Sequence, residues 1–260
     1  MKQFFSSLLV IFVLSFAFAD TYVLVHGAFQ DASAWNRVVP LLQAEGHEVS
    51  TVNLRGRAGD ETPSGEITLQ DHVDVVTQAI SSHTEPVILV AHSFGGIVAS
   101  QAAELVPEKI DTLVYVAAYM PEDGQSMLEL ASIDHWSGIS TENFVVAQDY
   151  SYGEILESDR VTVFCGDCTA RDAELTSSTL LKEPLTPLRT PVSLSEENFG
   201  SVRKVYVETT ADNAVSYLLQ LIMQANHQVD AHQWLHTSHA PFTTMPDALV
   251  KTILSLVESN

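Results

Sequence analysis

The amino-acid sequence predicts an α/β fold in which a mostly parallel, doubly wound sheet carries a helical lid insertion. Apolar runs typical of buried strands alternate with segments whose apolar residues recur at helical spacing. Each strand-like run is continuously apolar, as expected when helices cover both faces of a parallel sheet. The alternation lapses over residues 121–200, which contain short helical pieces and several prolines, and then resumes. We therefore expect one domain with an inserted lid.

The first strand and helix lie at the start of this pattern. TYVLVHG (21–27) is apolar, rich in β-forming residues and ends in glycine, so it predicts a buried strand. ASAWNRVVPLLQAEG (32–46) has apolar positions at helical spacing and stops at Gly46, which predicts a helix. Pro40 lies inside this segment, where proline normally weakens a helix.

The next elements continue the alternation. EVSTVNL (48–54) predicts a strand, and a polar loop follows at 54–66. LQDHVDVVTQAIS (69–81) predicts a helix with one apolar side. VILVAH (87–92) predicts a buried strand, and GGIVASQAAELV (95–106) predicts a helix whose small residues let it pack close to the sheet.

The remaining elements flank and follow the insertion. TLVYVAA (112–118) predicts another buried strand before it. After it, RKVYVE (203–208) and HQVDAHQWL (227–235) predict strands, separated by a helix at 214–225. PDALVKTILSLVE (246–258) predicts the final helix.

Size and charge restrict the class of protein. The chain has 260 residues, 46% of them hydrophobic, which is enough for one large core. Its net charge is −21 and its 12 Lys and Arg residues are scattered, whereas nucleic acids require clustered cations. We expect no nucleic-acid partner and interpret the acidity as a solubilising surface. The oligomeric state stays open.

The first 19 residues resemble a secretory signal peptide. A short basic start precedes an apolar run of 15 residues, FFSSLLVIFVLSFAF, and Ala17-Phe18-Ala19 fits a small-x-small cleavage site. An uncleaved anchor is the alternative, but the run is shorter than the roughly 20 residues that span a bilayer. We expect cleavage before Asp20, leaving residues 20–260 as a single domain that is exported to the periplasm or the medium and is not inserted in a membrane.

The only two cysteines are Cys165 and Cys168, in the sequence CGDC. They are compatible with an incidental or structural role, with a local disulfide that closes a very small loop, or with a redox centre. No second Cys or His pair lies at metal-ligand spacing, so we expect no metal.

Ser93 lies at the end of the strand in VILVAHSFGG. A buried strand that delivers a serine into a sharp turn before a helix is the nucleophile elbow, usually written G-x-S-x-G. Here the pattern is A-H-S-F-G, with Ala91 replacing the first glycine. The turn would place the hydroxyl at the carboxyl edge of the sheet, where ligands bind in open α/β folds.

A nucleophilic serine needs a base, and His239 is the best candidate for this role among the ten histidines. It follows the last predicted strand through HTSHAPF and precedes the last helix. His26, His92 and His236 lie in or next to apolar stretches, and we interpret them as core residues.

An acid must orient that base, and Asp212 in ETTADNA follows a predicted strand in the chain order Ser…Asp…His. An aspartate at this place also suits a helix N-cap. Glu122 and Asp123, after the strand that ends in AAYMP, are the alternatives.

Acyl transfer also needs donors for the oxyanion. We expect the backbone N–H of Phe94, directly after the nucleophile, and that of Ala28 in the HGAF loop. Gly27 is expected to free the backbone to turn there.

Five aromatic residues of the insertion are candidates for lining a substrate pocket, or they form the insertion's own small core. They are Trp136, Phe144, Tyr150, Tyr152 and Phe164.

From about Thr21 to its end, the chain resembles the α/β-hydrolase superfamily, and within it the branch of plant methylesterases, hydroxynitrile lyases and their bacterial esterase relatives. The motifs that carry this resemblance are YVLVHGAF, VILVAHSFGG, YVAAYMPEDGQS, RKVYVETTADNA and SHAPFTTMP, together with CTARDAEL in the lid. The resemblance implies the α/β-hydrolase fold, with Ser93 as nucleophile, Asp212 as acid and His239 as base. It also implies Ala28 and Phe94 as oxyanion donors.

The resemblance implies a cofactor-free serine esterase (a carboxylesterase-type hydrolase) that cleaves small carboxylic esters, and the signal peptide predicts that it is secreted. Hydroxynitrile lyases of this branch have a lysine directly after the catalytic histidine and Thr or Asn after the histidine of the first strand. Those positions are Ala240 and Gly27 here, which disfavours a lyase. A non-catalytic receptor for a small ligand on the same fold is the other alternative.

Overall fold

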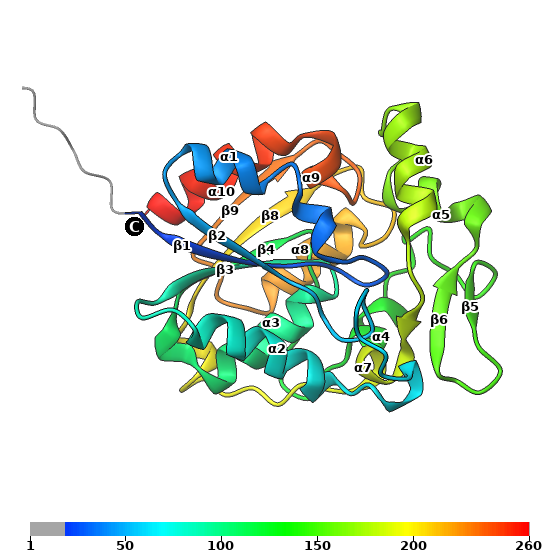
Figure 1. Cartoon of the computed structure of the whole chain (residues 1–260), viewed down its shortest axis with the longest axis horizontal. Helices are drawn as coiled ribbons and strands as arrows, with labels where there is room; N and C mark the ends of the chain where they lie inside the picture. Colours follow the sequence, from blue (N-terminus) through cyan, green and yellow to red (C-terminus); the bar gives the residue numbers. More distant parts are fainter. Residues whose placement is uncertain (1–18, 260) are drawn as a thin grey trace, which may run out of the picture.

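The computed structural model describes residues 19–259, and its core is a six-stranded parallel sheet in the order β2-β1-β3-β4-β8-β9 (Figure 1). The strands are β1 (Thr21–Val25), β2 (Glu48–Val52), β3 (Val87–His92), β4 (Ile110–Val116), β8 (Arg203–Thr209) and β9 (Ala231–Leu235). This sheet confirms the predicted fold class. Apart from Ala19, the predicted signal peptide lies outside the described residues.

Alternating side chains of each strand enter two cores, one on each face of the sheet. Val23 and Val25 of β1 lie in one core, and Tyr22 and Leu24 lie in the other. The first core is covered by α2 (Leu69–Ser81), α3 (Gly95–Leu105) and α8 (Tyr217–Ala225). The second is covered by α1 (Val39–Ala44) and α10 (Pro246–Glu258), on the opposite side of the sheet in Figure 1.

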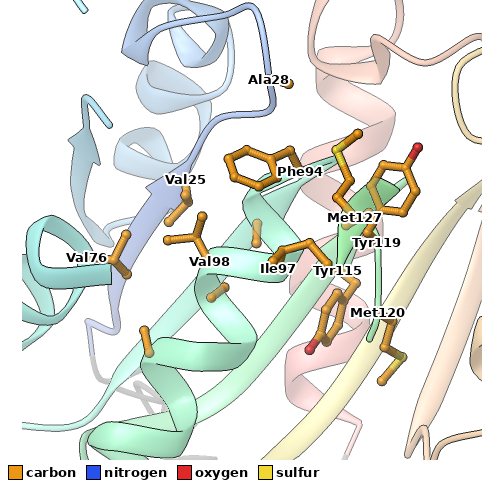
Figure 2. Packing of buried hydrophobic residues seen from close by; sticks show 14 of the residues in the cluster. Val25, Ala28, Val76, Phe94, Ile97, Val98, Tyr115, Tyr119, Met120 and Met127 are labelled. Carbon is orange, nitrogen blue, oxygen red and sulfur yellow. The ribbon is translucent and has the colours of Figure 1, made fainter. Parts of the chain in front are cut away.

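Helix α3 packs closely against the sheet, which fixes its first turn next to the end of β3. Figure 2 shows Val98 of α3 beside Val25 of β1 in a cluster of buried side chains. A Cβ atom on Gly96 would lie 2.2 Å from the carbonyl oxygen of Tyr119, so only glycine permits this approach.

The single helix predicted over residues 32–46 is wrong. The structure has a 3₁₀ helix at Ala32–Trp35 and a separate α1 at Val39–Ala44. Asp31 caps the first piece by accepting the N–H of Ser33. Pro40 lies in the first turn of α1, where a missing N–H removes no helical hydrogen bond. The proline therefore marks the start of a helix rather than its interior.

Two later elements are shorter than predicted. Helix α8 begins at Tyr217 instead of residue 214, because the Ser216 hydroxyl caps it. Strand β9 covers only Ala231–Leu235 of the predicted 227–235.

The chain between β4 and β8 forms a lid at the carboxyl ends of the parallel strands (Figure 1). Its helices are α4 (Met127–Ser132), α5 (Glu157–Phe164), α6 (Ala170–Thr179) and α7 (Leu185–Arg189). It also contains an antiparallel sheet of β5 (Phe144–Val146), β6 (Tyr152–Ile155) and β7 (Glu183–Pro184). Sequence periodicity missed this sheet because strands of two to four residues are too short to show it.

The remaining elements are short. They are α9 (Pro241–Thr244) and the 3₁₀ helices at Ser64–Glu66, Pro107–Lys109 and Phe199–Ser201. Within residues 19–259, no helix has both the length and the apolar character that crossing a bilayer requires.

Candidate active site

Ser93 occupies a strained turn between β3 and α3. Its φ angle is 54°, in the left-handed region that non-glycine residues rarely adopt. The Ser93 carbonyl oxygen accepts the N–H groups of Gly96 and Tyr119, each at 3.0 Å, and its own N–H donates to Val116 at 3.3 Å. These bonds hold the serine in a conformation that costs about 1–3 kcal/mol.

The spacing of small residues around Ser93 reflects steric limits. A Cβ atom on Gly95 would lie 2.7 Å from the carbonyl oxygen of His26. Ala91, in contrast, is fully buried within β3 and its methyl group is accommodated. The turn thus requires glycine on its helix side and accepts alanine on its strand side.

His239 and Asp212 lie in line with Ser93. The Nε2 atom of His239 is 2.9 Å from the Ser93 hydroxyl, and its Nδ1 atom is 2.8 Å from Oδ2 of Asp212. All three residues are buried, with Ser93 8% exposed. The structure therefore brings together three residues that are distant in the sequence, in the geometry of a nucleophile, a base and an orienting acid.

The two oxygens of Asp212 have different partners. Oδ1 accepts the backbone N–H groups of Ala214 and Val215, at 2.8 and 2.9 Å. Oδ2 faces His239 and also accepts the Thr209 hydroxyl at 2.7 Å. The residue thus holds its own loop with one oxygen and the imidazole with the other.

The alternative acids lie elsewhere. Glu122 and Asp123 are exposed, and their side chains bond to Gln125 and to the N–H of Leu194. Neither has a hydrogen bond or ion pair with His239 among the described residues.

His92, interpreted from the sequence as a core residue, also supports His239. Its Nε2 atom is 2.8 Å from the carbonyl oxygen of His239, and the two ring centroids are 4.5 Å apart. Burial lowers the pKa of His92 well below its usual value, so the ring is neutral and its Nε2–H donates to that carbonyl. In the sequence, only the position of His92 directly before Ser93 pointed to this supporting role. His236, by contrast, is exposed, so its interpretation as a core residue is wrong.

His26 connects the end of β1 to the loop after β2. Its Nδ1 atom is 2.8 Å from the Gly27 carbonyl oxygen, and its Nε2 atom accepts the N–H of Leu54 at 3.1 Å. Burial lowers its pKa to about 3, which keeps the ring neutral with the proton on Nδ1. The ring therefore fixes the start of the loop that contains Ala28.

The backbone N–H groups of Ala28 and Phe94 belong to the loop after β1 and to the residue directly after the serine. Neither donates a hydrogen bond to another atom within residues 19–259. Gly27 has no positive φ, so the expectation that it frees the backbone to turn is wrong. Glycine is needed for space instead, because a Cβ atom at this position would lie 2.8 Å from both Ser93 Cβ and His92 Nδ1.

Replacing Gly27 with alanine should therefore lower both stability and activity. The added methyl group must displace Ser93 or His92, and overpacking of this kind costs about 1–3 kcal/mol. Thermal unfolding and hydrolysis of p-nitrophenyl butyrate measure the two effects. Gly166→Ala is the matched control, since its Cβ atom would meet nothing closer than 3.6 Å. Equal activity of both variants would contradict the steric argument.

The five lid aromatics have different surroundings. The Phe164 ring is buried, with its centroid 5.8 Å from the rings of both His239 and Phe29. Phe144 packs one layer further away, 6.3 Å from Phe29. The other three contact neither the serine nor the histidine: Trp136 is 57% exposed, Tyr150 is 64% exposed, and the Tyr152 hydroxyl accepts a hydrogen bond from Lys182. Trp136 and Tyr150 therefore lie on the surface of the lid, and Tyr152 is partly buried there.

Cys165 and Cys168 form a disulfide, one of the arrangements the sequence left open. The loop that they close presents Asp167 to the segment before His239. Its carboxylate accepts the Thr237 hydroxyl at 2.7 Å and the Ser238 N–H at 3.1 Å. The lid thus contacts the loop that carries the histidine.

The chain is similar to known proteins in both sequence and fold. Residues 22–252 match the family described as "Alpha/beta hydrolase family". "Putative methylesterase 11, chloroplastic" of Arabidopsis thaliana is 31% identical over 90% of the chain and 63% of its own length. The chain likewise covers only 55% and 56% of two further chloroplastic relatives from that plant.

Solved structures share the fold. Polyneuridine aldehyde esterase has a TM-score of 0.82 at 22% identity, covering 92% of this chain and 100% of that one. Tomato methylketone synthase I has a TM-score of 0.81 at 23% identity, covering 92% of this chain and 97% of that one. The family match and the methylesterase similarity together confirm the resemblance read from the motifs.

Proposed function

The chain belongs to the alpha/beta hydrolase family, and we propose that it is a serine hydrolase that cleaves small carboxylic esters. The observation that carries this proposal is the hydrogen-bonded line from Ser93 through His239 to Asp212. The backbone N–H groups of Ala28 and Phe94 are the proposed oxyanion donors. The curated relatives are named methylesterases, which supports an ester substrate. The low exposure of Ser93, 8%, supports a small one.

Acylation begins with the proton of the Ser93 hydroxyl. Asp212 accepts the Nδ1–H of His239, which leaves Nε2 unprotonated and facing the hydroxyl. His239 takes the serine proton as Oγ attacks the ester carbonyl, and the negative charge that develops on the carbonyl oxygen is stabilised by the two N–H groups. The carbon–oxygen bond to the alcohol then breaks, and the alcohol leaves with the proton from His239.

Deacylation repeats these steps with water. His239 removes a proton from a water molecule, the resulting hydroxide attacks the acyl group, and the carboxylic acid leaves as Ser93 regains its proton. The Asp212 carboxylate stabilises the transient imidazolium in both halves of the reaction.

Hydrolysis of p-nitrophenyl butyrate, combined with labelling by diethyl p-nitrophenyl phosphate, tests this function. We expect turnover of the ester, and transfer of one diethylphosphoryl group to Ser93, located by mass spectrometry of peptides. Esters that vary separately in acyl and alcohol length then define the substrate range. Labelling elsewhere, or no ester turnover, would contradict the proposal. Cyanide release from mandelonitrile without ester turnover would favour a lyase.

We also propose that the chain is exported and that residues 1–19 are removed. Strand β1 begins at Thr21, so cleavage before Asp20 leaves the whole sheet. A disulfide between Cys165 and Cys168 is compatible with an oxidising compartment. Expression of the full chain in a bacterial host should give periplasmic protein whose first residue is Asp20. Replacing Ala19 with arginine should prevent cleavage. Export would be contradicted if the chain without this substitution stayed intact in the cytoplasm of the host.

A further inference from the structure

Phe29, the residue after Ala28, is held in an unusual backbone conformation. Its φ angle is 63°, in the left-handed region, although it is neither glycine nor asparagine. Such a conformation costs about 1–3 kcal/mol and persists only when neighbouring groups hold it. Phe29 directly follows Ala28, whose N–H is the proposed oxyanion donor.

Both backbone polar groups of Phe29 bond to the lid. Its carbonyl oxygen accepts the N–H of Leu181 at 2.7 Å. Its N–H donates to the Oε2 atom of Glu183 at 2.6 Å. The segment at the start of β7 therefore fixes the Phe29 peptide groups on both sides.

Arg57 completes the arrangement from the loop after β2. Its Nη2 atom donates to the same Oε2 atom of Glu183 at 2.6 Å, and its Nε atom donates to the carbonyl oxygen of Gln30 at 2.6 Å. Arg57 is 2% exposed and Glu183 is fully buried. Three separate segments thus meet at one carboxylate oxygen: the Phe29 loop, the Arg57 loop and the lid.

An ion pair in this environment is a poor means of stabilising a fold. Removing two charges from water costs several kcal/mol each, and apolar side chains of similar size often stabilise a protein as well or better. The second oxygen of Glu183, Oε1, has no hydrogen-bond partner within residues 19–259. The bonds of the pair are instead concentrated on Phe29 and Gln30, which points to a role in geometry.

We propose that Glu183 and Arg57 are positioning residues that hold the Phe29 backbone so that the Ala28 N–H faces Ser93. The lid thereby completes the oxyanion hole. This inference rests on the proposed function, because it assigns a partner to the donor on which the hydrolysis depends.

Glu183→Met tests the inference by removing the acceptor while keeping a side chain of similar length. We expect kcat for p-nitrophenyl butyrate to fall about 10- to 100-fold, as for a small misplacement of a catalytic group, with KM changed less than about twofold. Glu183→Gln should retain most of kcat, since its amide oxygen can replace Oε2 and its NH₂ group can occupy the unpartnered Oε1 position. This rescue distinguishes positioning from a general loss of stability.

A second readout reports the oxyanion directly. 1,1,1-Trifluoro-2-pentanone forms a tetrahedral adduct with the serine, whereas 2-pentanone serves as the ground-state probe. In Glu183→Met the inhibition constant of the trifluoro ketone should rise by the same factor as kcat/KM falls, with that of 2-pentanone unchanged.

Glu104→Met is the matched control. Its carboxylate also accepts two backbone N–H groups, those of Ser195 and Phe199, but it bonds to neither Ser93 nor the Phe29 loop. It should lower the melting temperature without changing kcat. If Glu183→Met does not fold, Arg57→Gln supplies the same test, because it removes the group that links Gln30 to Glu183, and kcat should again fall at least about tenfold.

The outcomes separate the inference from the proposed function. If Ser93→Ala is as active as the wild type, the proposed function fails. If Ser93→Ala is inactive while the folded Glu183 or Arg57 variants keep the wild-type kcat and the wild-type affinity for the trifluoro ketone, only the positioning role is overturned.

Discussion

Ser93→Ala is expected to lower kcat/KM for p-nitrophenyl butyrate by about 10⁴- to 10⁶-fold. The variant has no nucleophile, so an acyl-enzyme cannot form, and the remaining rate comes only from substrate binding and the oxyanion donors. The substitution removes only the hydrogen bond between the Ser93 hydroxyl and His239, because the bonds that hold the turn are made by the backbone. Steady-state kinetics and thermal unfolding measure the two properties, and the melting temperature should change little.

Ser100→Ala is the matched control for this variant. Ser100 is also a fully buried serine, on α3, and its hydroxyl bonds to Gly96 and Tyr115 instead of to a histidine. We expect it to reduce stability slightly and to leave kcat unchanged. An alanine at position 93 that retained more than a tenth of the wild-type rate would rule out Ser93 as nucleophile.

Asp212→Asn is expected to lower kcat by about 10⁴-fold, as loss of the orienting acid does in serine proteases. The asparagine oxygen can still accept the N–H groups of Ala214 and Val215 at the Oδ1 position. Its NH₂ group then faces His239 and Thr209, where the carboxylate accepted hydrogen bonds. The imidazole is forced into the tautomer with the proton on Nε2, which cannot accept the proton of Ser93.

Asp134→Asn provides a comparison for the acid. Asp134 is also buried, and its Oδ2 atom accepts the backbone N–H of Ser216 at the start of α8, without contacting the histidine. The kcat of the Asp134→Asn variant should match that of the wild type. If Asp212→Asn instead reduced only the melting temperature, the carboxylate would be a loop cap and nothing more.

Asp212 makes one set of hydrogen bonds to its own loop and another to His239, which explains why the sequence left its role open. An aspartate three residues after a strand, before a helix, suits both an N-cap and a catalytic acid. The structure gives the cap to Ser216, while Oδ1 of Asp212 bonds to the N–H groups of its own loop and Oδ2 bonds to a side chain 27 residues away. Only the second of these contacts distinguishes Asp212 from Glu122 and Asp123.

Features that depend on local pattern could be predicted from the amino-acid sequence. Patterns of apolar residues identified the strands of the parallel sheet and most of the helices that cover it. The bounds of α2, β3 and α10 were predicted to the residue. The elbow around Ser93 was recognisable because its steric limits act within a few residues of the serine. His239 was identified because its place between the last strand and the last helix is a feature of chain order.

Features that depend on long-range contacts could not be predicted and arise only in the folded chain. Arg57 and Glu183 are 126 residues apart, and nothing in the polar loop or in the lid sequence indicated that they meet beside Phe29. The same holds for the carbonyl of His239 on the ring of His92, 147 residues away. Local propensity carries no information about such pairs, because the free energy that brings them together comes from packing the whole sheet and its lid.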